Sequence, residues 1–158
     1  MKADGPGAGR RPALALEVQL ATRSRRAPAG AQLRRWARAT LGRPADVTLR
    51  IVGEREGRAL NREFRGRRHA TNVLTFCYRE TGRLAGDIVL CAPVIVREAR
   101  AQGKALDAHY AHLTVHGLLH LQGYDHDNSR KARIMEAKEV AILHRLGFAD
   151  PYFTPAPR

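Results

Sequence analysis

Hydrophobic and polar positions alternate over several short stretches of the chain, and this period of two predicts β-strands. In the stretch 46–52, Val47, Leu49 and Ile51 alternate with polar neighbours. The strands predicted in this way cover residues 14–20, 46–52, 71–78 and 87–92. A turn at Thr81-Gly82 separates the last two strands, which therefore form a hairpin.

Apolar positions three or four residues apart predict five helices. They cover residues 29–41, 56–65, 93 to about 103, 106–122, and 129 to about 147. The stretch 106–122 is apolar nearly all round, which is typical of a buried helix, and Gly123 is placed to end it. Ser129 is predicted to cap the last helix. The packed side of that helix is predicted to carry Ile134, Ala137, Ala141 and Ile142.

Together these elements predict an α+β fold, in which a mixed four-stranded sheet packs with about five helices. A length of 158 residues suits one hydrophobic core and is short for two. Residues 1–12 mix Gly, Pro and Arg and are predicted to be a disordered basic tail. Residues 13–152 then form a single domain, and residues 153–158 form a C-terminal tail.

The charge of the chain changes this picture from a plain globular domain to one with an anionic partner. Lys and Arg number 28 against 15 Asp and Glu, which gives a formal net charge of +13. Such self-repulsion does not stabilise a fold, so a negatively charged partner is indicated, with nucleic acid ahead of an anionic membrane. A codon-usage bias toward Arg and Ala is the alternative explanation.

Composition also bears on location. No apolar run approaches the ~18 residues of a membrane span, and Glu17 interrupts the first apolar segment, which argues against a signal peptide. The two cysteines, Cys77 and Cys91, lack a CxxC spacing and are predicted to be free, buried thiols in a reducing cytosol. The protein is therefore expected to be cytoplasmic.

The segment HGLLHLQGYDH, residues 116–126, carries the candidate chemistry. His116 and His120 lie four residues apart, so both imidazoles project from one face of the predicted buried helix. If Gly123 ends the helix and the chain turns back, His126 becomes a third ligand of the same ion. Three imidazoles leave one position open on a tetrahedral zinc ion, as in catalytic sites. A histidine pair at this spacing also arises by chance, but the added glycine and third histidine favour metal.

The spacing matches the zinc-protease pattern HExxHxxGxxH with one departure, because Gly117 stands where those proteases keep the glutamate general base. The site therefore suits metal-assisted hydrolysis but not peptide hydrolysis by that mechanism. Asp125 and Asp127 flank His126 and are candidates to orient an imidazole through its other nitrogen, with helix capping as the alternative role for Asp127. His109 and His112 lie on the same stripe as His116. They are either partners of the site or ordinary packing and surface residues.

This segment strongly resembles the H-G-x-L-H-L-x-G-Y-D-H signature of the YbeY family of bacterial rRNA-processing endoribonucleases. Four other segments fit the same family, and the resemblance spans about residues 45–152. They are LNREFRG (60–66), TNVLTF (71–76), GDIV (86–89) and LGFADPY (146–152). Three positions depart from the family pattern in ways that concern loop shape and substrate preference. His69 replaces Asp or Asn, while Ala70 and Cys77 each replace proline.

The resemblance implies a single-strand-specific, metal-dependent endoribonuclease that acts in 16S rRNA 3′-end maturation and ribosome quality control. Its partners would be rRNA, the small ribosomal subunit and ribosome-associated proteins, with no membrane. It also implies that His116, His120 and His126 hold one zinc or other divalent transition-metal ion, and that Arg65 is the functional arginine. A non-catalytic RNA-binding ribosome-assembly factor with a structural zinc is the alternative from another class.

Overall fold

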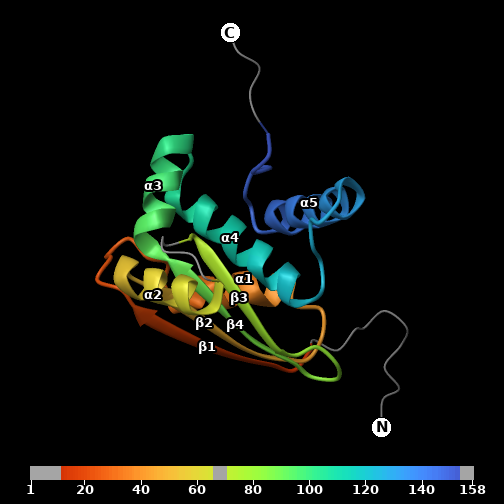
Figure 1. Cartoon of the computed structure of the whole chain (residues 1–158). Coiled ribbons are helices and arrows are strands. Elements are labelled where there is room, and N and C mark those ends of the chain that lie inside the picture. Colours follow the sequence, from red (N-terminus) through yellow and green to blue (C-terminus); the bar gives the residue numbers. More distant parts are fainter. Residues whose placement is uncertain (1–11, 66–70, 154–158) are drawn as a thin grey trace.

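The computed structural model describes residues 12–65 and 71–153. These residues form four strands and five helices (Figure 1). In chain order they are β1 (Leu14–Ala21), α1 (Gly30–Thr40), β2 (Ala45–Val52), α2 (Glu54–Arg65), β3 (Val73–Arg79), β4 (Leu84–Cys91), α3 (Ala92–Gln102), α4 (Leu106–Leu121) and α5 (Ser129–Arg145).

The four strands form one mixed sheet in the order β1-β2-β4-β3. β1, β2 and β4 run parallel, whereas β3 pairs with β4 in the predicted antiparallel hairpin. β4 begins at Leu84, three residues earlier than the pattern predicts, because Leu84 is fully buried and pairs with Ala45 of β2. The predicted α+β class with a mixed four-stranded sheet is confirmed.

Helices cover both faces of the sheet (Figure 1). The larger of the two core clusters lies on one side of the sheet. α1 and α4 pack against one face, where Leu33 and Trp36 of α1 and Leu118 of α4 are fully or almost fully buried. α2 covers part of the other face, with Val94 of α3 beside it. There a smaller cluster holds Val52, Leu74, Val89 and Cys91, with Leu60 of α2 packed against it.

α4 is the central helix of the fold, since it contacts α1, α3, α5, β3 and β4. This explains why its sequence is apolar nearly all round. Two glycines let it lie close to the sheet. A Cβ atom at Gly117 would lie 3.2 Å from the side chain of Ile88, and one at Gly86 of β4 would lie 2.4 Å from Leu121. The positions of α4 and of its histidines are therefore set by close contact with β4.

α5 differs from its predicted packing. Ile134 is 50% exposed, and Ala137 and Ala141 are also exposed, so of the predicted face only Ile142 is buried. The buried positions are instead Met135, Glu139, Ile142 and Leu143. The prediction failed because it assumed an apolar stripe, whereas the real stripe has a glutamate at its centre. The N-terminal cap of the helix is Asn128, whose side chain accepts a hydrogen bond from the Lys131 amide. The two candidates from the sequence, Ser129 and Asp127, do not cap it.

Two expectations from composition meet different outcomes. Both cysteines are free, but only Cys91 is buried, and the exposed Cys77 corrects the prediction of two buried thiols. Among the helices of residues 12–65 and 71–153, none is both long and apolar enough to cross a membrane.

Candidate metal centre

The C-terminal end of α4 brings the three predicted histidines together. Gly123 adopts a φ of 98°, a left-handed conformation that ends the helix as predicted, and the chain then turns back. The ring centroids of His116 and His120 lie 4.8 Å apart, and that of His126 lies 5.0 Å from His120 and 5.8 Å from His116. One ring nitrogen from each lies within 4.8 Å of the others, a spacing suited to gripping one ion.

The three imidazoles face a cleft of about 400 Å³ between the end of α4 and the edge strand β3. The β3 side of this cleft is lined by Thr71, Asn72, Val73, Thr75 and Cys77. His116 and His120 are half-buried and His126 is exposed. The candidate site is therefore open to solvent on one side and walled by uncharged side chains on the other.

Glu139 of α5 holds His116 from behind. Its Oε1 lies 2.6 Å from Nδ1 of His116. Since an ionised carboxylate can only accept, Nδ1 carries a hydrogen and donates it to Glu139, which leaves Nε2 as the nitrogen for a metal ion. A carboxylate that orients a metal-binding histidine in this way is common in zinc sites.

Glu139 is itself fully buried, with 0% of its side chain exposed. Burial alone raises the pKa of its carboxyl, but hydrogen bonds from His112, His116 and Tyr152 outweigh burial and lower the pKa to about 2. The His112 bond measures 2.9 Å, and the Tyr152 hydroxyl donates to the same oxygen, Oε2. The carboxylate is thus ionised at neutral pH and has partners on both oxygens.

The donor set fits a transition-metal ion. Burial lowers the pKa of His120, and its proximity to His116 and His126 lowers the pKa further, which favours the neutral form of the ring. Neutral imidazole is the form that binds metal, and three such ligands are typical of zinc sites that keep one open position.

Gly117 does not face the cleft. A side chain there would meet Ile88 and Val73 at 3.2–3.3 Å, in the packed layer between α4 and the sheet. The absence of a protease-type glutamate at position 117 therefore has a steric cause.

The described cleft lining also contains no carboxylate. Asp125, next to His126, accepts a hydrogen bond from the Asp127 amide and pairs with Lys131 at 3.6 Å.

Arg65, the predicted functional arginine, is the last residue of α2. Its side chain lies outside the described part of the structure, as do Arg67, Arg68, His69 and Ala70. Arg62 is exposed on α2. The role of Arg65 therefore remains a prediction.

His112 and His109 take different places. His112 shares the Glu139 carboxylate with His116, which makes it part of the network behind the candidate ligands. His109 lies farther along α4, and its Nε2 is 3.0 Å from Oε1 of Glu98 on α3.

Glu139 and Tyr152, which lie behind the candidate ligands, were missed by the sequence interpretation. A signal for Glu139 was present, since it lies four residues after Met135 and three and four residues before Ile142 and Leu143. A lone acid in a helical apolar stripe indicates a buried, paired carboxylate.

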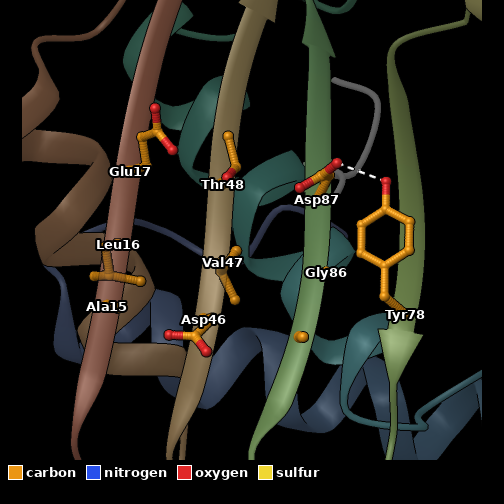
Figure 2. A pocket seen from close by; sticks show the side chains of 10 residues that line it. Ala15, Leu16, Glu17, Asp46, Val47, Thr48, Tyr78, Gly86 and Asp87 are labelled. Atoms are coloured by element: carbon orange, nitrogen blue, oxygen red, sulfur yellow. Dashed lines mark hydrogen bonds between the residues drawn. The ribbon is translucent and has the colours of Figure 1, made fainter.

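A second hollow, of about 560 Å³, lies on the opposite face of the sheet (Figure 2). Glu17, Thr48 and Asp87 line it side by side on β1, β2 and β4, and Asp87 accepts a 2.7 Å hydrogen bond from the Tyr78 hydroxyl. None of the residues that line it is a predicted site residue. The acidic lining also makes this hollow a poor place for a nucleic acid.

Comparison with known proteins gives one consistent family. A family model described as Endoribonuclease YbeY matches residues 23–147. A protein of Aromatoleum aromaticum named Endoribonuclease YbeY is 53% identical over 153 residues, which cover 96% of this chain and 99% of that protein. One of the same name from Nitrosomonas europaea is 55% identical over 139 residues, 88% of this chain and 85% of that protein.

A solved structure supports the fold. The solution structure of TM1509 from Thermotoga maritima superposes with a TM-score of 0.51 at 24% identity. The superposition covers 88% of this chain and 99% of that chain. At this identity the likeness concerns the fold alone.

Proposed function

The chain belongs to the YbeY family of endoribonucleases, and we propose that it is a metal-dependent enzyme that cleaves single-stranded RNA. We further propose that its substrate is the 3′ end of the 16S rRNA in the small ribosomal subunit, in maturation and in ribosome quality control. Location in the cytoplasm, where ribosomes are assembled, is part of the same proposal.

The observation that carries the proposal is the group formed by His116, His120 and His126 in an open cleft. The cleft exposes the face where a ligand position would remain free, as hydrolytic zinc sites require. A bound zinc ion supplies an activated water and polarises a phosphate oxygen. Purely structural zinc sites, by contrast, close all four positions with protein ligands.

The residues of the chain prepare the site for this ion. Glu139 fixes the proton of His116 on Nδ1, so Nε2 is available without reorganisation. Burial of His120 lowers the pKa of its imidazole, which favours the neutral form that binds metal. The described cleft lining carries no carboxylate, so it offers no carboxylate base for the deprotonation of water.

The charge of the chain supports RNA as the substrate. A net charge of +13 favours a polyanion over a peptide, and Gly117 removes the base that a zinc protease of the matching pattern uses. Arg65 is proposed to pair with charge that develops on the phosphate oxygens, since a guanidinium donates two parallel hydrogen bonds to such a group.

The test is single-turnover cleavage of a defined single-stranded RNA by protein stripped of metal and then restored with zinc. Cleavage that disappears on stripping and returns on restoration supports the enzyme. Tight RNA binding without cleavage in either state would instead support the rival, a non-catalytic ribosome-assembly factor with a structural zinc. A double-stranded RNA of the same sequence is the matched control, and it should be cleaved slowly.

A further inference from the structure

Asn72 lines the histidine cleft just before β3, and its side chain is fixed by neighbours on two sides. The Oδ1 atom accepts a 2.7 Å hydrogen bond from the amide of Val73. The Nδ2 atom donates to both carboxylate oxygens of Glu98, at 3.1 and 3.3 Å. The carboxamide is therefore held in one orientation at the wall of the cleft.

Glu98 is held in turn by His109 of α4. The distance from His109 Nε2 to Glu98 Oε1 is 3.0 Å, and only 4% of the His109 side chain is exposed. Burial lowers the pKa of His109 more than Glu98 raises it, which favours a neutral ring that donates one N–H to Glu98. Side chains from α4 and α3 thus form a chain of hydrogen bonds that ends on Asn72.

These hydrogen bonds from His109 through Glu98 to Asn72 do not hold the candidate metal ligands, because the carboxylate that contacts His116 is Glu139 and not Glu98. It places two ionisable side chains, one of them buried, behind a neutral amide. Burial of polar groups is costly unless their hydrogen bonds are made. When such groups hold a single amide in place, that amide is typically a residue that binds a ligand.

The fixed carboxamide keeps some hydrogen-bonding capacity. A carboxamide has two N–H donors and two acceptor lone pairs. The bond from the Val73 amide uses one lone pair of Oδ1. The two Glu98 oxygens share one hydrogen of Nδ2, so the contact with Glu98 uses one donor. One donor and one acceptor remain for a ligand in the cleft, within the described contacts of this residue.

The other polar groups on this wall are the hydroxyls of Thr71 and Thr75. The described wall has no cation, so it is a poor match for a phosphate, which arginine or lysine normally binds. A ribose 2′-hydroxyl is both donor and acceptor, and it is the group that distinguishes RNA from DNA. It matches the capacity that Asn72 keeps.

We infer that Asn72 binds a ribose 2′-hydroxyl of the strand in the cleft, with Glu98 and His109 as positioning residues. This inference rests on the proposed function, because it presupposes that the cleft takes RNA. It adds a residue that selects RNA over DNA independently of the metal.

The test compares the affinity of the full-length, metal-loaded protein for an RNA and a DNA oligonucleotide of one sequence. Fluorescence anisotropy is read by rapid mixing, before cleavage. Wild type should bind RNA about tenfold more tightly than DNA, and Asn72→Ala should lose most of this preference by weakening RNA binding alone, a loss the size of one hydrogen bond. Cys77→Ala, on the same wall, is the matched control and should keep the preference.

Glu98→Ala should lose part of the preference and Glu98→Gln should recover it, because glutamine still offers an oxygen to the Asn72 amide. If Asn72→Ala does not fold, Asn72→Ser replaces it, since a hydroxyl can still accept from the Val73 amide.

An equal loss of RNA and DNA affinity in the residue 72 variant overturns the inference, as does a wild type without preference or a preference that the substitution leaves unchanged. A wild type that neither binds nor cleaves RNA overturns the proposed function itself. The two failures are thus distinguishable.

Discussion

The Nδ1 atom of His116 and the Oε1 atom of Glu139 lie 2.6 Å apart, although the two residues are 23 positions apart in the sequence. This contact joins α4 to α5 and determines which nitrogen of His116 faces the cleft. The side chain of Glu139 has no exposed surface, and its carboxylate accepts hydrogen bonds from three side chains. The candidate metal centre therefore depends on the packing of α5.

Removing this contact should weaken metal binding without abolishing it. We expect Glu139→Gln to lower zinc affinity by about 10–100-fold, because loss of a carboxylate behind a metal-binding histidine has this size of effect elsewhere. Competition with a chelator of known affinity measures it. Glu136→Gln, an exposed glutamate on the same helix, is the control. Equal zinc affinity in both variants would show that Glu139 is not coupled to the ion.

Glu139 also shows where sequence interpretation stops. The periodicity of α5 placed Ile134, Ala137 and Ala141 in the core, because an apolar stripe was assumed and Glu139 interrupts it. The partners that make a buried glutamate tolerable come from α4 and from Tyr152 near the C-terminus. Such long-range pairs leave no local pattern in one sequence.

The close approach of α4 to the sheet should be sensitive to the volume at Gly86. A Cβ atom there would lie 2.4 Å from Leu121 and 2.5 Å from the backbone oxygen of Phe76. Gly86→Ala should therefore lower the free energy of unfolding by roughly 1–3 kcal/mol, the usual cost of overpacking. Gly53→Ala, where nothing lies within 4 Å, should change it by less than about 1 kcal/mol. Urea denaturation of both variants decides the matter, and similar midpoints would contradict the packing argument.

Arg65 is expected to act on the reaction and not on the ion. Arg65→Ala should lower the single-turnover cleavage rate by ~10²-fold or more, comparable to losing one preorganised donor. Arg65→Lys should recover part of the rate, because it keeps the charge without the planar fork. Metal content and melting temperature should stay at wild-type values. Cleavage by Arg65→Ala at the wild-type rate would remove Arg65 from the mechanism, and loss of metal or fold would make its role structural.

Binding of RNA should be mainly electrostatic, as the net charge of +13 suggests. The logarithm of the affinity should fall linearly with the logarithm of salt concentration, with a slope of about −0.7 for each phosphate contacted on a single strand. Anisotropy titrations over a range of salt concentrations measure the slope. A nearly flat dependence would point to a small substrate or a protein partner.

Local features of the sequence were predicted well, and features that depend on packing were not. The spacing of His116, His120 and Gly123 lies within one helix and its end, so it specified their arrangement directly. The strands followed from alternation, and the hairpin from the turn at Thr81-Gly82. The exposure of Cys77 depends instead on the position of β3 at the edge of the sheet, which the residue pattern within one β-strand does not reveal.

The most direct test of the metal centre measures bound metal and cleavage rate in the same samples. Metal-free protein is titrated with zinc, and bound zinc per chain is compared with the single-turnover rate on a single-stranded RNA. We predict that the rate rises in proportion to bound zinc and saturates at about one ion per chain. Bound zinc and cleavage should both be lost in the variants His116→Ala, His120→Ala and His126→Ala. The variant His112→Ala should retain its metal. Full-rate cleavage by metal-free protein, or unchanged metal content in the three variants, would contradict the account.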